Sequence, residues 1–308
     1  MLAMACILPL AACGGDDEPS NAPTSRESAA SSDESNPLEA AAAVVSPEPA
    51  ITREERRRRA ALTLLQEKLQ KTKDSDDRAE LLAEVAQFGT HAKTLWPEVL
   101  AGFKDEESWT RAVALETAAK VDPVGCQPLL VQGLADDEAE VREKAATAWA
   151  VAGIKELSPL LDRIPEEFEG RVQFAIMVTV DKVGEKHHVP LVAKVLGDLD
   201  SGALKPTVRF LGRNGGKEHA ATIAEYLERN DVDLRILTAR TLKKIGEKSK
   251  PVLTGLAAAL RDDAPSVREA AIDALKGLTG QDLGYEVETE EDAEEASKAW
   301  VEWISRNT

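Results

Sequence analysis

Two adjacent histidines and one cysteine are the side chains in the body of the chain whose types could support chemistry. Adjacent positions on a helix point about 100° apart, so His187 and His188 do not converge on one metal ion. No Cys or His spacing supplies the two or three further ligands of a zinc site, so we expect both histidines to lie in solvent near a helix start. Cys126 begins an apolar run. That position predicts a small buried core residue, with a reactive thiol as the alternative.

A glycine-rich segment from Gly212 to Lys217 has some residues of a phosphate-binding loop. It lacks the G-x-x-x-x-G-K-[ST] spacing and follows a predicted helix instead of a strand, so we interpret it as a helix–helix turn. No nucleophile-elbow, zinc-protease or dinucleotide motif occurs in the sequence, and no carboxylate pair is isolated in an apolar run. The sequence therefore predicts a protein that is not an enzyme, with no catalytic residue, cofactor, metal site or small-molecule substrate.

Cys13 follows an apolar run, residues 1–12, that carries no charge. The run is shorter than the roughly 20 residues that span a bilayer and is typical of a signal-peptide core. Residues Leu10-Ala11-Ala12-Cys13-Gly14 resemble the lipobox of bacterial lipoproteins, Leu-[Ala/Ser]-[Gly/Ala]-Cys. The resemblance implies cleavage before Cys13 and a diacylglyceryl group on its sulfur. It also implies a membrane anchor on the periplasmic or outer-surface side of a bacterial cell envelope.

One departure from the usual signal bears on this anchor. No Lys or Arg precedes the apolar run, so we expect either a start upstream of Met1 or a weak export signal. An ordinary cleaved signal with an incidental cysteine, or a buried N-terminal helix, is the alternative.

Residues 13–50 have the composition of a disordered acidic linker. Between 14 and 50 the chain holds eight acidic residues, one base (Arg26) and no aromatic residue. Such a segment buries too little apolar surface to offset its ordering entropy. We expect a flexible tether with a reach of roughly 35 Å.

The composition of the whole chain limits which folds and which kinds of partner are possible. The 308 residues include 38 Lys+Arg and 55 Asp+Glu, a net charge of −17, which argues against a nucleic-acid binder. The hydrophobic fraction of 43% supports a large core, and the aromatic fraction of 4% favours helices over a β-sandwich. Three cysteines do not make a disulfide scaffold.

A pattern of about thirty residues recurs after residue 74. Its clearest copy is 141–153, matched by 234–246 and 267–279, and one slot of the pattern falls at 78, 111, 142, 173, 201, 235 and 268. Each copy predicts a helix with apolar residues at i, i+3, i+4 and i+7, ended by a glycine such as Gly153, Gly184 or Gly212. A second amphipathic helix follows, with a proline near its start: Pro97, Pro128, Pro159, Pro190 and Pro251.

Such a helical hairpin cannot bury its apolar face alone, so stacked copies are expected to form an all-α solenoid. We predict about seven stacked hairpins over 74–280. A capping helix at 51–73 would open with a capping box from Thr52 to Glu55. The last segment, 281–308, combines an acidic stretch with a capping helix whose Trp300, Trp303 and Ile304 share one side.

These residues resemble the HEAT repeat family in its short bacterial form, related to the phycobilisome-lyase-type HEAT-like repeats. The resemblance implies a superhelix in which an Asp and an Arg six residues later form a polar ladder between repeats. Three pairs keep that spacing: Asp105 and Arg111, Asp136 and Arg142, Asp262 and Arg268. Three depart from it and leave the central ladder open: Glu167 and Gln173, Val195 and Ser201, Arg229 and Arg235.

The function that this pattern predicts is a protein–protein interaction scaffold of the cell envelope, lipid-anchored through Cys13. The binding face would be concave and lined by second helices, near 93–104, 126–135, 156–163, 187–197, 216–229 and 248–261. The net acidity favours a basic or neutral protein partner. The alternative is an enzyme or accessory subunit related to the bilin-lyase-type HEAT-like proteins.

The basic run Arg56–Arg59 also has two interpretations. It could contact anionic lipid headgroups or an acidic partner. We favour a solvated helix face whose positive charges balance those of Glu54 and Glu55, because the four arginines point in different directions around a helix.

Overall fold

The computed structural model describes residues 51–283 and 289–308, and all the regular structure in those ranges is helical. The predicted all-α solenoid is therefore confirmed. Residues Thr52–Thr308 form one compact unit. The predicted signal peptide (1–12), the linker (13–50) and Cys13 lie outside the described residues.

Seven hairpins follow an N-terminal helix, α1 (Arg53–Lys71). The first helices of the hairpins are α2 (Ser75–Ala86), α4 (Ser108–Val121), α6 (Ala139–Ala152), α8 (Gly170–Val183), α10 (Ser201–Asn214), α12 (Val232–Ile245) and α14 (Pro265–Thr279). The second helices are α3 (Trp96–Phe103), α5 (Gln127–Gly133), α7 (Ser158–Leu161), α9 (Val189–Val195), α11 (Ala220–Ala224), α13 (Lys250–Ala259) and α15 (Glu290–Asn307). Short 3-10 turns extend several of them: η1 (Gly89–Leu95), η2 (Ile164–Glu166), η3 (Lys186–His188), η4 (Leu196–Asp198), η5 (Lys217–His219) and η6 (Glu225–Glu228).

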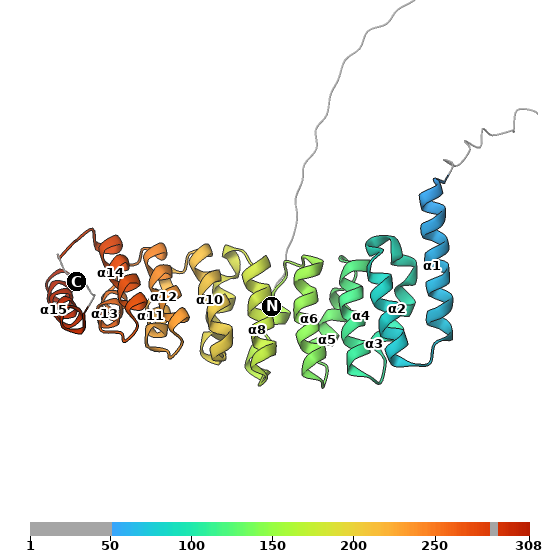
Figure 1. Cartoon of the computed structure of the whole chain (residues 1–308), viewed down its shortest axis with the longest axis horizontal. Helices are drawn as coiled ribbons and strands as arrows, with labels where there is room; N and C mark the ends of the chain where they lie inside the picture. Colours follow the sequence, from blue (N-terminus) through green and yellow to red (C-terminus); the bar gives the residue numbers. More distant parts are fainter. Residues whose placement is uncertain (1–50, 284–288) are drawn as a thin grey trace, which may run out of the picture. The chain divides into compact units, whose positions relative to one another are not determined.

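The first helices stand side by side in one row, each packed on the next from α2 to α14 (Figure 1). The second helices lie behind them, where α7 packs on α9, α11 on α13, and α13 on α15. The buried apolar residues of both rows form one continuous core from Leu62 to Ile304. Because each hairpin buries its apolar face only against its neighbours, the stack is the unit that is stable.

Small residues let the first helices approach closely. Helix α4 buries four alanines against its neighbours: Ala112, Ala114, Ala118 and Ala119. Threonines bridge adjacent first helices at the same depth. The Thr117 hydroxyl donates to the Leu82 carbonyl at 3.1 Å, and the Thr179 hydroxyl donates to the Ala146 carbonyl at 2.8 Å. These buried hydroxyls fix one helix against the next with a directional bond in an apolar surround.

The glycine exits follow the predicted pattern in some repeats and not in others. Gly153 and Gly246 end α6 and α12 with φ of 69° and 75°, a left-handed conformation that favours glycine. The expectation for Gly212 is wrong. It is buried inside α10, where an added Cβ would lie 2.9 Å from Thr241 Cγ2, and the residue after the helix is Gly215. Gly212 is therefore a close-packing residue.

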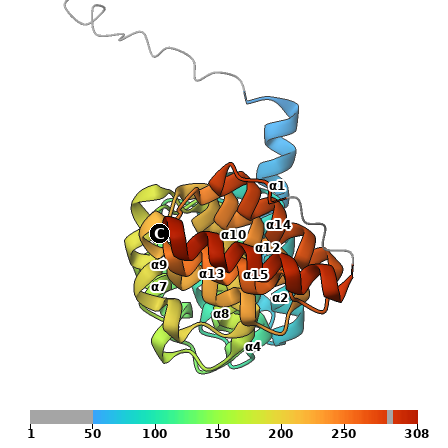
Figure 2. The ribbon, with the colours of Figure 1, turned by 90° about the vertical axis from the view of Figure 1, so that its left-hand side faces the viewer.

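The two terminal helices cover the ends of the stack. Helix α1 buries Leu62, Leu65 and Leu69 against the first hairpin. At its start the Thr52 hydroxyl accepts from the Glu55 N–H at 3.1 Å, while the Glu55 carboxylate bonds Arg59. At the other end α15 lies across the stack on α13 (Figure 2).

The buried face of α15 carries the residues that hold it in place. Trp300 and Ile304 are buried, and the Ser297 hydroxyl donates to the Ala257 carbonyl of α13 at 2.8 Å. Trp303 is half-buried, and its ring meets the Trp300 ring edge-on with centroids 5.8 Å apart.

Candidate interaction surface

A ladder of arginines joins successive hairpins where each first helix begins. The guanidinium of Arg111 donates to both carboxylate oxygens of Asp136 in the next hairpin, at 2.8 and 2.9 Å. Arg142 contacts Glu167 in the same way, at 2.7 and 3.0 Å. These bidentate pairs are largely buried, which is the geometry in which arginine holds a carboxylate most firmly.

The six-residue spacing between Asp and Arg does not produce a side-chain ion pair between the two residues. Arg111 donates to the backbone carbonyl of Asp105, six residues earlier, and Arg142 donates to that of Asp136, at 3.0 and 2.9 Å. The carboxylate of Asp105 instead receives Arg78 of the preceding hairpin. Each arginine thus closes its own turn and reaches forward to the next.

The last predicted pair follows the same rule. Arg268 donates to the Asp262 carbonyl at 2.8 Å, and the Asp262 carboxylate receives Arg235, with Arg235 Nη2 at 2.8 Å from Asp262 Oδ1. The Asp262 carboxylate also accepts from the Ala264 N–H at 2.9 Å, which satisfies a free donor near the start of α14.

The ladder keeps its carboxyls ionised. Burial by itself raises the pKa of the Glu167 carboxyl. Hydrogen bonds from Arg142 and the Glu169 N–H, with the charges of Arg142 and Arg163, outweigh burial and hold the pKa below its usual range. Burial also raises the pKa values of Asp105 and Asp136, and hydrogen bonds outweigh it and lower both: for Asp105 from the Ser75 hydroxyl, the Glu107 N–H and Arg78, and for Asp136 from Arg111 and the Glu138 N–H.

The sequence did not predict how the ladder continues at its centre. In the structure a glutamine side chain takes the place of an arginine there. Gln173 occupies the arginine position of α8, and its Nε2 donates to the Glu167 carbonyl at 2.8 Å and to the Asp198 carbonyl at 3.1 Å. Its Oε1 accepts from the Asp200 N–H at 2.6 Å. A buried glutamine can therefore replace an Arg–carboxylate pair because it offers both donor and acceptor.

The next position is a true gap, and the slot assigned to Ser201 is wrong. Arginines and Gln173 occupy the fourth residue of their helices, and the fourth residue of α10 is Leu204. Leu204 is buried and apolar, and Arg229, 25 residues further on at the position that a carboxylate holds for Arg111 and Arg142, is exposed. The polar ladder is therefore interrupted between α10 and α12.

The second helices present a smooth, small-residue surface, which we call the second-helix face. Lys194 and Lys250 are the only charged residues among the exposed positions of α3, α5, α9, α11 and α13. The other exposed positions there are Pro97, Ala101, Pro128, Val131, Gln132, Pro190, Ala221, Thr222, Pro251, Thr254 and Ala258. Prolines in the first turn of four of these helices fix the backbone at that surface.

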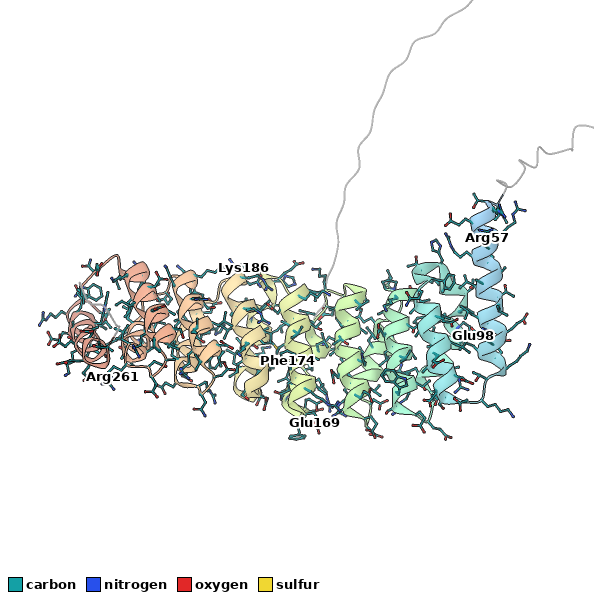
Figure 3. The ribbon with its side chains drawn as sticks, in the orientation of Figure 1. Arg57, Glu98, Glu169, Phe174, Lys186 and Arg261 are labelled. Atoms are coloured by element: carbon teal, nitrogen blue, oxygen red, sulfur yellow. The ribbon has the colours of Figure 1, made fainter. Side chains whose placement is uncertain are left out.

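A hollow of about 650 Å³ lies at the N-terminal end of this face, between α1 and α3. Glu98 lines it, and its Oε1 accepts from Gln66 Nε2 at 2.9 Å and Gln70 Nε2 at 3.0 Å. Glu98 Oε2 is buried and has no hydrogen-bond partner among the described residues (Figure 3). Lys73 and Lys104 border the hollow.

The two histidines are not equivalent, so the expectation that both lie in solvent is wrong for one of them. His188 is buried, with Nδ1 accepting from the Glu185 N–H at 3.0 Å and Nε2 facing the Lys155 carbonyl at 2.9 Å. His187 is exposed. His188 therefore caps a 3-10 turn and ties two hairpins together, a role that depends on a contact 33 residues away.

Cys126 lies in the core, and burial raises the pKa of its thiol to about 11. A thiol of that pKa is protonated at neutral pH and is a poor nucleophile. Residues 51–283 and 289–308 contain no cluster of three His, Cys, Asp or Glu that could hold a metal ion. None of the described helices is long and apolar enough to cross a membrane.

Comparison with known proteins finds a family match in the C-terminal half of the chain. Residues 189–276 match the HEAT repeat family. No curated protein sequence matches the chain.

Three solved structures are similar in fold. The CpcE–CpcF complex of phycocyanin lyase from Nostoc sp. PCC7120 is 16% identical, with 83% of this chain and 97% of that chain covered and a TM-score of 0.42. An engineered protein is 16% identical, covers 84% of each chain and has a TM-score of 0.43. Human deoxyhypusine hydroxylase is 17% identical, with 80% and 96% covered and a TM-score of 0.36.

Proposed function

We propose that the chain is a non-catalytic scaffold of a bacterial cell envelope that binds a protein partner along the second-helix face and is anchored through an acylated Cys13. The observation that carries the proposal is the composition of that face, where the exposed positions of α3, α5, α9, α11 and α13 are mostly small and uncharged, with Lys194 and Lys250 as the exceptions. Small, rigid residues lose little conformational entropy when a partner covers them, and uncharged ones require little desolvation. The first helices, by contrast, expose charged residues such as Glu80, Arg209 and Lys244.

The charge of the chain supports a basic or neutral partner. The turns that lead into the first helices are acidic, and they border the second-helix face where each second helix ends. A protein partner with basic side chains at its rim would meet these carboxylates across the interface, which accelerates association and fixes orientation.

The anchor is tested on the protein made in bacteria. Mass spectrometry of the mature N-terminus should find Cys13 as the first residue with a diacylglyceryl mass, and Cys13→Ser should release the chain from membranes. An unmodified Cys13 would contradict the anchor and leave the binding face untouched.

The binding face is tested by capture from a detergent-solubilised envelope. Wild type should recover a stoichiometric protein partner. Val131→Glu with Thr254→Glu places two charges on the second-helix face and should reduce recovery by about tenfold or more. Thr147→Glu with Ser266→Glu adds the same charge to exposed positions of α6 and α14 and should recover the partner normally. Equal loss in both variants, or no partner under any condition, would contradict the proposal.

An enzyme or accessory subunit related to the bilin lyases is the alternative that the repeat resemblance brings. Co-expression with a bilin-producing pathway separates the two. A chromophore bound to the purified chain would replace the scaffold proposal.

A further inference from the structure

The two long edges of the helix rows carry opposite charge. We define the basic edge as the start of α1 (53–59) and the turns where α8, α10 and α12 end (182–188, 213–219 and 243–250). The acidic edge comprises the turns where first helices begin (72–78, 104–111, 136–142, 162–171, 196–201, 225–235 and 261–268). Figure 3 places Arg57 and Lys186 on one side of the rows, and Glu169 and Arg261 on the other.

The basic edge holds a clear excess of cations. Residues 53–59 contain five arginines and two glutamates, and residues 243–250 contain four lysines and one glutamate. Each of the turns 182–188 and 213–219 has two cations and one glutamate. Several edge cations are exposed and have no ion-pair partner in the described part of the chain: Arg56, Arg57, Lys182, Lys186, Lys217, Lys244, Lys248 and Lys250.

The acidic edge holds the complementary excess. Residues 136–142 contain four acids and one arginine, and residues 196–201 contain two acids and no base. Two of the arginines there are engaged within the chain, because Arg142 is paired with Glu167 and Arg235 with Asp262, whereas Arg229 is exposed. This edge therefore repels an anionic surface.

Helix dipoles explain part of the separation of acidic and basic residues between the two edges. They do not explain all of it. Acids near helix starts and bases near helix ends are stabilised by the helix dipole. Lys217, Lys248 and the arginines at the start of α1 gain nothing from such a dipole, because they lie outside the last turns of helices or at a helix start. Their position needs another explanation.

We infer that the basic edge lies against a membrane surface with anionic headgroups, so that the acidic edge faces away. This inference rests on the proposed membrane anchor. Thr52, through which the chain enters the helix rows, is the N-cap of α1 and so lies on the basic edge. A tether that leaves from this edge brings its cations, and not the acids, nearest to the point of attachment. Each Lys or Arg near an anionic surface strengthens binding to it.

The test uses the full chain with Cys13→Ser, so that an acyl group cannot carry the binding. Sedimentation with phosphatidylcholine vesicles containing about 30% phosphatidylglycerol, at about 0.05 M salt, should show binding that about 0.3 M salt removes. Lys186→Gln, Lys217→Gln, Lys244→Gln and Lys248→Gln together should reduce binding by at least about tenfold. A control with the same net charge alters exposed cations of the opposite edge, and its binding should fall by less than about twofold: Lys73→Gln, Lys104→Gln, Arg171→Gln and Arg261→Gln.

Three outcomes would overturn the inference. Equal loss in the two quadruple variants would show a response to total charge and not to an edge. Equal binding to vesicles with and without phosphatidylglycerol would exclude the headgroup charge. Retention on immobilised heparin without vesicle binding would assign the edge to an acidic polymer. Failure of the proposed anchor is read separately, from the mass of the mature N-terminus.

Discussion

Two buried glutamates show at the residue scale why burial alone does not predict a residue's contribution to stability. Glu167 is 3% exposed and receives a bidentate arginine and a backbone N–H. Glu98 is 9% exposed and receives two glutamine amides on one oxygen, while its other oxygen has no partner among the described residues. Both oxygens of the Glu167 carboxylate therefore have hydrogen-bond donors, whereas only one oxygen of the Glu98 carboxylate does.

Neutralising the two glutamates should therefore have different effects. Glu167→Gln leaves Arg142 buried without its counter-charge and should lower the free energy of unfolding by about 3 kcal/mol. Glu98→Gln removes a poorly satisfied charge and should change it by less than about 1 kcal/mol. Urea denaturation of both variants measures the difference. Equal losses would show that the bidentate pair contributes nothing beyond burial of a carboxyl.

The ladder carboxyls also predict the direction of the pH dependence. Asp105, Asp136 and Glu167 have pKa values lowered on folding, so the unfolded chain binds more protons in acid than the folded chain does. Their stabilisation is complete above the usual carboxyl range near about 4 to 4.5, and it is lost as pH falls below that range toward the lower pKa values of the folded state. Unfolding free energies measured from about pH 7 to 3 should decline below about pH 5. Glu167→Gln should make that decline shallower, and an unchanged slope would contradict the assignment.

Single residues were predicted to different degrees for physical reasons. The period placed Asp136 and Arg142 in the same turn, but the carboxylate that Arg142 reaches is 25 residues further on, a distance that spacing within one repeat does not reveal. His188 was misjudged for the same reason, because its partner Lys155 belongs to the preceding hairpin. Thr117 and Thr179 were missed. Their signal was present as a threonine in the tenth position of three first helices, α4, α8 and α12.

At the scale of the elements, some helices approach each other closely only because one of them has a glycine at the contact. At the end of α5, a Cβ on Gly133 would lie 2.6 Å from Leu115 Cδ1 and 3.0 Å from Ala145 Cβ, both in the core. In α13, a Cβ on Gly255 would meet Leu227 Cδ1 at 3.5 Å, an ordinary contact. The helices and their prolines follow from the sequence period, whereas which glycines touch a neighbour does not.

The two glycines should respond to alanine with opposite signs. Gly133→Ala forces a gap between α4, α5 and α6 and should lower the free energy of unfolding by about 1–3 kcal/mol. Gly255→Ala raises helix propensity without a clash and should increase it by up to about 1 kcal/mol. Thermal melting followed by circular dichroism distinguishes them, and stabilisation by both substitutions would refute the close contact at Gly133.

At the scale of the whole array, stability is a sum over neighbouring hairpins, so one weak junction divides it. The junction between α10 and α12 lacks a ladder rung because Leu204 and Arg229 occupy the positions that an arginine and a carboxylate hold in the rungs of Arg111 and Arg142. An ion pair between Lys205 and Asp231, at 2.8 Å, spans the same junction. Its side chains are about a third and a half exposed, and such pairs contribute little.

Hydrogen exchange should reveal this division. In rising urea, amides of α12 and α14 should become exchangeable together at a lower concentration than those of α6 and α8, which a continuous ladder joins. Mass spectrometry of peptides from the full chain measures this. One common urea dependence for all four helices would show that the missing rung does not weaken the junction.

The binding role of the second-helix face is the central claim, and site-specific photocrosslinking in intact cells tests it most directly. A photoreactive residue at Val131 of α5 or Lys194 of α9 should yield one discrete adduct with the same protein partner. The same residue at Thr147 of α6 or Arg240 of α12, exposed on first helices, should yield none. Adducts from the first-helix positions alone, or no adduct from any position, would contradict the account.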